Sequence, residues 1–250
     1  MAATIASTAS SARTASQLPG RRYDHLFFSA MVALMLATVF LGFARSYYLA
    51  GVFHAPLPSR IIHIHGAAFS AWMLLLITQT SLVAAGRTDI HRRLGLAGFV
   101  LGCAMIVIGV LAATDSLVRH AGSTFVGLDP RTFYIIPITD VVLFGTFLGF
   151  AFRNRRDCPA HKRYILLATT ALLLAATARW PFLHSLLIAD LLTYSFPVLL
   201  VAYDLWSTRK LHRVTLWAGA LLIVIHQVRI PIGNTAVWHS FADWVLRLAR

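Results

Sequence analysis

The sequence contains no glutamate: all nine acidic residues are aspartate, against 22 lysines and arginines. This absence excludes the HExxH helix of zinc proteases and every acid–base scheme built on Glu. The two cysteines, Cys103 and Cys158, form no CxxC, CxxCH or iron–sulfur spacing, so we expect two free thiols. No P-loop, GxGxxG, GxSxG or Ser/His/Asp constellation occurs either. The last apolar segment lacks lysine, which excludes a retinal Schiff base.

Charged residues are also scarce, at 12% of the chain, whereas apolar residues make up 58% and the mean hydropathy is +0.71. Soluble domains contain about 45–50% apolar residues, so this composition indicates a membrane protein. The basic excess lies in short loops between apolar segments. A positive-inside distribution explains it better than nucleic-acid binding, and we expect no nucleic-acid partner.

Seven apolar segments, each about as long as the ~20 helical residues that cross a bilayer, follow a polar tail. Their apolar residues run continuously instead of alternating, and lipid does not tolerate unpaired backbone, so we expect helices. The predicted fold class is an all-α polytopic membrane helical bundle with about seven transmembrane helices. The segments lie at 25–45, 61–85, 93–116, 134–152, 162–181, 187–206 and 213–230.

The basic residues also predict an orientation. One side of the predicted bundle carries 14 of the 22 lysines and arginines and should be cytoplasmic, which places the N-terminus inside and the C-terminus outside. We therefore expect a multi-pass protein of the cell inner membrane. Three regions are predicted: a disordered cytoplasmic tail at 1–23, with a transit peptide as the alternative, a transmembrane domain at 24–232 and an amphipathic interfacial segment at 233–250.

The interfacial segment is predicted from apolar residues that recur at helical spacing on one face. These residues are Val237, Phe241, Trp244, Val245 and Leu248.

A His–basic signature opens three predicted helices on the cytoplasmic side: "HRRLG", "HKRY" and "HRVT". We expect these residues to bind anionic lipid headgroups, with cytoplasmic haem ligation as the alternative. Nearby Asp204 is expected to neutralise Arg209 or Lys210. The sequence does not decide whether the protein has partners in a membrane complex. The predicted headgroup ligands are His91, Arg92, Arg93, His161, Lys162 and Arg163.

Ionisable residues also gather at one predicted depth, within about two helical turns of the outer boundary. Such residues are costly inside a membrane and mark functional sites. We therefore predict a shared outer-leaflet site. Its predicted cofactor-binding residues are His65, Asp115, Asp140, Arg179 and His226.

Helical geometry separates the two histidines of "IIHIHG". His63 and His65 are about 200° apart around the helix axis, so they cannot readily bind one ion together. His65 lies on a stripe with Trp72 and Gln79, at spacings of seven and fourteen residues. We predict that His65 faces the bundle and that His63 lies at the membrane interface.

Three chemistries fit this set of residues. His65, Asp140 and His226 would suit a divalent metal ion, with Asp115 as a supporting group or base. His65 and His226 could instead ligate a b-type haem. Arg179 would hold an anion or pair with Asp190, and Asp–His chains without metal form proton relays.

The leading functional hypothesis from the sequence is a metal- or haem-binding, redox-linked membrane module. The alternatives are a proton-coupled transporter of a small solute and a structural or accessory subunit. The sequence does not decide whether the protein is an enzyme.

The motifs "HIHGAAFSAW", "HRRLGLAGF" and "HKRYILLAT", over residues 60–220, resemble a group of uncharacterised bacterial seven-helix membrane proteins. That resemblance implies the class and no activity. The chain is more weakly similar to cytochrome b561-type membrane proteins, in which HG and HxxLG patterns open haem-carrying helices. His65–Gly66 and His91 with Gly95 match those patterns, but the predicted topology places them at opposite faces of the membrane.

Overall fold

The computed structural model describes residues 23–56, 58–121, 127–182 and 185–249. The predicted disordered tail falls almost wholly outside them. Within the described ranges the chain is helical, with no β-strand. Its helices are α3 (Asp24–Phe43), the π-helical turn η1 (Ala44–Tyr48), α4 (Arg60–Ala84), α5 (Thr88–Arg119), α6 (Pro130–Arg153), α7 (Cys158–Ala171), α8 (Leu174–Thr177), α9 (Leu186–Thr208), α10 (Arg213–Gly233) and α11 (Ala236–Ala249).

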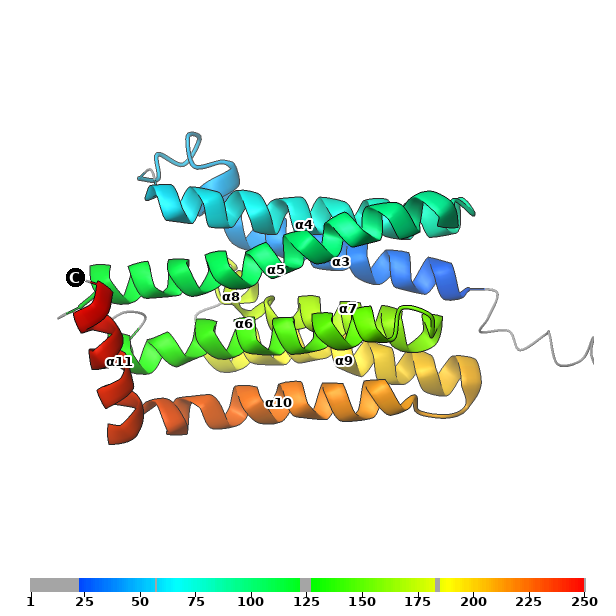
Figure 1. Ribbon diagram of the computed structural model, residues 1–250. Helices are drawn as coiled ribbons and strands as arrows, with labels where there is room; N and C mark the ends of the chain where they lie inside the picture. Colours follow the sequence, from blue (N-terminus) through cyan, green and yellow to red (C-terminus); the bar gives the residue numbers. More distant parts are fainter. Residues whose placement is uncertain (1–22, 57, 122–126, 183–184, 250) are drawn as a thin grey trace, which may run out of the picture.

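The long helices lie along one bundle axis, and neighbours such as α4 and α5, or α5 and α6, run in opposite directions (Figure 1). Six of them are long and apolar enough to cross a membrane: α3 with η1, α4, α5, α6, α9 and α10. Each begins and ends within a few residues of a predicted segment, except that α5 extends five residues before and three after segment 93–116. The prediction of a helical membrane bundle is confirmed at this level.

The predicted segment 162–181 is the exception, because the structure divides it. Helix α7 ends at Ala171 and only the single turn α8 follows. At the break, the backbone N–H groups of Leu172 and Leu173 donate three residues back, to Thr169 and Thr170. Both threonine hydroxyls donate to carbonyls four residues back, an interaction that bends helices. The prediction of one continuous helix was wrong.

Close packing holds this broken segment in place. Gly42 of α3 lies against α8, and a Cβ at Gly42 would come within 2.2 Å of the Ala176 carbonyl oxygen. Only glycine permits that approach of two backbones.

The core and the outer surface are both apolar, as expected for a bundle in lipid. Phe144 and Phe147 of α6 pack with Met35 of α3 and Leu167 of α7 in the main buried cluster. Large apolar side chains also point outward, among them Trp217 at 71% exposure. A water-soluble protein rarely exposes so much contiguous apolar surface. This distribution is that of a multi-pass membrane protein.

Helix α11 lies across one end of the bundle, steeply inclined to α10 (Figure 1). Its Ala242 is fully buried in a small cluster with Leu117 of α5 and Tyr134 of α6. Of the predicted apolar face, Val245 packs against this cluster, whereas the other four residues are exposed. Both sides of α11 are therefore apolar. We call this end of the bundle the carboxyl end, and the end where α3 begins the amino end.

Candidate functional site

Three helices bring four ionisable side chains together in the carboxyl-end half of the bundle. Arg229 of α10 donates from Nη1 to Oδ1 of Asp140 of α6 over 2.5 Å. His226 lies one turn before Arg229, with Nε2 3.3 Å from the same Oδ1. Asp190, in the first turns of α9, places Oδ1 4.0 Å from Nη2 of Arg229. We call these four residues the carboxyl-end cluster.

Local sequence explains how α10 presents two members of the cluster. Its buried residues Thr215, Leu222, His226 and Arg229 recur at three- and four-residue multiples, which places them on one face. Helix α10 packs on α6, α7 and α9. Arg229 was not among the predicted site residues, although its i, i+3 spacing from His226 is the pattern that places two side chains together.

Three residues of the carboxyl-end cluster are buried and Asp190 is half-buried, but the cluster is not saturated with hydrogen bonds. The side chain of His226 has no exposed surface, yet neither ring nitrogen has a hydrogen-bond partner among the described residues. Its 3.3 Å approach to Asp140 is therefore a close contact without hydrogen-bond geometry. Oδ1 of Asp190 is also buried and unpartnered. Buried polar groups are normally hydrogen-bonded, and an exception calls for an explanation such as strain, a functional role or a bound water or ion.

The charges of the carboxyl-end cluster do not balance. Two carboxylates face one guanidinium, and with a neutral imidazole the net charge is −1. An uncompensated charge is expensive in a low-dielectric interior. One bound proton or one other monovalent cation makes this cluster neutral.

Tyr194 and Gln227 lie beside the cluster. Nε2 of Gln227 donates to the Tyr194 hydroxyl over 2.7 Å, and the Tyr194 ring lies 6.0 Å from the His226 ring, centroid to centroid. Both side chains are more exposed than His226. They are thus placed between the buried imidazole and the surface of the bundle.

The other predicted site residues lie elsewhere. His65 of α4 stacks on Phe69, with ring centroids 4.0 Å apart, and its Nδ1 is buried without a partner. Helix α4 lies on the opposite side of the bundle from α10 (Figure 1). No group of three His, Cys, Asp or Glu residues in the described ranges is placed to hold a metal ion. The predicted metal site of His65, Asp140 and His226 is therefore not assembled.

Asp115 and Arg179 also lie outside the cluster. Asp115 accepts from Arg119, one turn later on α5, over 2.8 Å, and from Ser59 over 3.3 Å. Arg179 donates to the Ala175 carbonyl and lies over the Phe43 ring. The cation nearest to Asp190 is Arg229 and not Arg179, so the predicted pairing is wrong. Asp115 and Arg179 share a predicted depth with the cluster, but neither meets it.

At the amino end, a second buried ion pair is fully bonded. Asp204 of α9 accepts from Nε and Nη2 of Arg163 through Oδ1. Its Oδ2 accepts from Thr215 Oγ1 over 2.5 Å and from the His212 backbone N–H over 3.2 Å. Arg163 also donates to the Pro159 carbonyl over 2.8 Å. We call Arg163, Asp204, Thr215 and His212 the amino-end network; it joins α7, α9 and α10.

This network overturns two predictions from the sequence. Asp204 pairs with Arg163, and not with Arg209 or Lys210. Arg163 is 4% exposed and cannot reach a lipid headgroup. Lys162 donates to Asp24 of α3. Of the predicted headgroup ligands, Arg92 and Arg93 are the ones that lie exposed.

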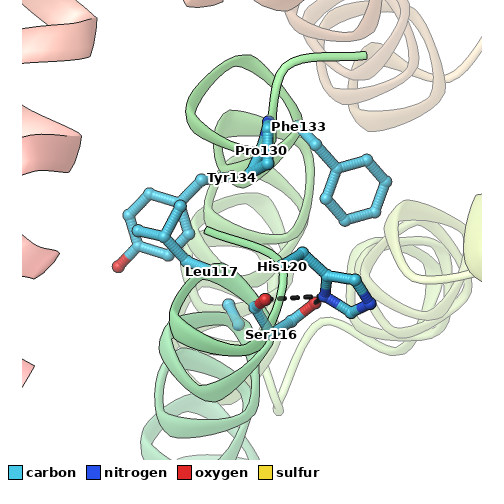
Figure 2. A pocket seen from close by; sticks show the side chains of 7 residues that line it. Ser116, Leu117, His120, Pro130, Phe133 and Tyr134 are labelled. Carbon is cyan, nitrogen blue, oxygen red and sulfur yellow. Dashed lines mark hydrogen bonds between the residues drawn. The ribbon is translucent and has the colours of Figure 1, made fainter. Parts of the chain in front are cut away.

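A shallow hollow at the carboxyl end carries no comparable chemistry. It lies between α5 and α6 and encloses no space large enough for a water molecule. Figure 2 shows the His120 ring turned back toward Ser116, whose carbonyl lies 2.8 Å from Nδ1. Apolar and aromatic side chains form most of its wall, including Leu117, Phe133 and Tyr134.

A scan of protein-family models, a search of curated proteins and a search of solved structures each found no match to this chain.

Proposed function

We propose that the protein is a proton-coupled transporter of a small solute, in which the carboxyl-end cluster binds the proton. The observation that carries the proposal is the buried, unpartnered imidazole of His226 beside Asp140 and Arg229. Buried Asp and His side chains are the groups from which membrane transporters build proton relays. One proton would neutralise this cluster, and releasing the proton would restore its net charge.

The helices that meet at the cluster can also change shape. Each contains an internal proline: Pro137 in α6, Pro197 in α9 and Pro231 in α10. An internal proline removes one backbone hydrogen bond and kinks a helix. Transporters commonly use such interrupted helices around a binding site. The prolines therefore support a site whose helices move as the charge of the cluster changes.

The topology that goes with this proposal has seven crossings. Helices α7 and α8 together form one interrupted crossing, the fifth in chain order, in addition to the six long helices. The basic amino end is cytoplasmic. The carboxyl-end cluster then lies in the outer half of the inner membrane, with α11 at the outer interface. The exposed residues Phe241 and Trp244 would contact lipid there. Arg92 and Arg93 would contact anionic headgroups inside.

A structural or accessory subunit is the second candidate, because the amino-end network pins three helices together with no group left to react. Metal or haem binding gains no support from the arrangement, since His65 and His226 belong to opposite sides of the bundle.

A pH jump on proteoliposomes tests the proposal before any solute is known. Proton binding to a buried site displaces charge, which a solid-supported membrane records as a transient current. We expect a transient current in the wild type and its loss in Asp140→Asn. The matched control is Asp115→Asn, which removes a half-exposed carboxylate paired within its own helix and should leave the current unchanged. A wild type without a current, or an unaltered current in Asp140→Asn, would refute the proposal.

A further inference from the structure

Two histidines from the His–basic signatures meet at the amino end, far from the carboxyl-end cluster. His91 in the first turn of α5 and His161 in α7 have ring centroids 6.5 Å apart and ring planes at 87°. Both side chains are partly buried. Sequence separates them by 70 positions, and the packing of α5 and α7 around the end of α6 brings them together.

A backbone carbonyl fixes the hydrogen position on His161. Its Nδ1 lies 2.9 Å from the Ala151 carbonyl oxygen, at the end of α6. A carbonyl oxygen can only accept, so Nδ1 carries the hydrogen and donates. In the neutral ring, Nε2 of His161 is then a bare acceptor.

Gln79 of α4 fixes the opposite arrangement on His91. In the amide orientation that satisfies both polar ends of Gln79, its Nε2 donates to His91 Nδ1 over 2.7 Å and its Oε1 accepts from Gly95 N over 3.0 Å. Nδ1 of His91 is therefore an acceptor, and its hydrogen sits on Nε2. Gln79 was predicted from the sequence only as a member of the His65 stripe.

The two rings thus differ in what they can do. His91 offers a hydrogen at Nε2, whereas His161 offers a lone pair at Nε2, and neither Nε2 makes a hydrogen bond to another described residue. The charged and titratable groups that act on His91 are His161 and Arg92, and no carboxylate is among them. Two positive rings would repel each other at this distance.

We propose that His91 and His161 together form the proton-exchange site at the amino face, which rests on the proton-coupled function proposed above. A hydronium ion in the cytoplasmic water transfers a proton to Nε2 of His161: one O–H bond breaks, the Nε2–H bond forms and a water molecule is left. The imidazolium keeps its hydrogen bond from Nδ1 to the Ala151 carbonyl. Nε2–H of His91 donates to the water molecule that is left. Release reverses the same step.

One substitution separates the titrating atom from the structural hydrogen bond. In His161→Asn the amide nitrogen replaces Nδ1 and still donates to Ala151, while the atom equivalent to Nε2 is gone. The matched control is His212→Asn at the same end. Nδ1 of His212 caps α10 by accepting from Val214 N over 3.2 Å, and an asparagine oxygen retains that cap.

The experiment uses proteoliposomes of known orientation, in which the pH is lowered at one face at a time. After a jump at the amino face we expect the transient current to fall at least fivefold in His161→Asn and to be unchanged in His212→Asn. When the pH is lowered at the carboxyl face instead, both variants should give the same current as the wild type. Thermal unfolding in detergent confirms that both variants are folded.

Two results would overturn the inference. If the amino-face current is equal in His161→Asn and in the wild type, the histidine pair is not the proton-exchange site. The function proposed for the carboxyl-end cluster is unaffected by that result. A wild type that responds only at the carboxyl face, with a response lost in Asp140→Asn, has the same consequence. No wild-type response at either face overturns both proposals together.

Discussion

The two ends of the bundle use the same ingredients, a buried aspartate and a buried arginine, in different ways. In the amino-end network, Asp204 and Arg163 neutralise each other, and both oxygens of Asp204 accept hydrogen bonds. In the carboxyl-end cluster, Arg229 faces two carboxylates, and His226 has no hydrogen-bond partner. The first arrangement is complete without any titration. The second has a formal charge of −1 when both carboxylates are ionised and the imidazole is neutral.

On this difference we base the structural role of the amino-end network and the functional role proposed for the carboxyl-end cluster. A fully satisfied polar network makes the packing of a membrane bundle specific, and changing its charge state gains nothing. An incompletely satisfied cluster keeps a free-energy cost that a ligand or proton can relieve. Burial and residue type alone do not distinguish the two ends. The count of charges and of hydrogen bonds does.

The largest effect should come from removing the charge at the centre of the amino-end network. Asp204→Asn leaves the buried guanidinium of Arg163 without a counter-charge, and breaking such a pair costs about 3–5 kcal/mol. Equilibrium unfolding in mixed detergent micelles measures this loss. The control is Asp89→Asn, whose pair with Arg87 is exposed and whose loss should be near zero. A change below about 1 kcal/mol in Asp204→Asn would contradict the structural role of the network.

Asp140→Asn should lower the free energy of unfolding by less than Asp204→Asn does, although it also removes a buried carboxylate. Arg229 retains Asp190 as a second counter-charge, and the substitution removes the excess negative charge of the cluster. We expect a loss of about 1–3 kcal/mol, the range for a broken buried hydrogen bond. The same unfolding assay compares the two variants directly. If Asp140→Asn destabilised the protein more than Asp204→Asn, the comparison between the ends would fail.

A smaller loss of stability should come from breaking the exposed ion pair of Asp129 and Arg131. Asp129 caps α6 by accepting from the Arg131 N–H, and its hydrogen bonds with the Arg131 side chain hold the pKa of this carboxyl below its ordinary value. The resulting stabilisation is present above the ordinary pKa of aspartate and is lost as the pH falls through the lower, folded value. Asp129→Ala should cost about 1 kcal/mol at neutral pH. An equal loss at neutral pH and at a pH below both pKa values would contradict this assignment.

The smallest effect should be a pH dependence at His212. Burial, followed by the nearby Arg163 charge, lowers the pKa of His212 below its ordinary value of 6.5. A histidine with a lowered folded pKa stabilises the protein fully above pH 6.5 and less as the pH falls toward the folded value. We expect stability to decline with acidification in that window and the decline to be weaker in His212→Asn. Thermal unfolding across the window measures it; identical pH profiles would exclude His212 as the cause.

The helices could be predicted from sequence far better than the site. Continuous apolar runs define where a helix can lie in lipid, so most ends were correct to a few residues. The break after Ala171 was missed because "LLLAAT" contains neither glycine nor proline, and the bend depends on threonine hydroxyls and on contact with Gly42. Depth along a helix is readable from sequence. The direction of a side chain around the bundle depends on packing.

Particular residues show the consequence of that limit. Asp140 and His226 were predicted together and lie together. His65, at the same predicted depth, belongs to a helix on the far side, and the described residues contain no group of three metal ligands. Arg163 was assigned to lipid because the motif "HKRY" looks like a surface anchor. Its partner, Asp204, is 41 positions away, and no local pattern connects the two residues.

The most direct test of the central claim makes the two ends alike. In Asp190→Asn the carboxyl-end cluster contains one carboxylate and one guanidinium, and it is balanced without a proton, like the amino-end network. Proton uptake by the purified protein is measured with a pH-sensitive dye from about pH 8 to about pH 5, where ordinary carboxyls stay ionised. The account predicts that the variant takes up one proton fewer per molecule than the wild type. Equal uptake by the two proteins would contradict it.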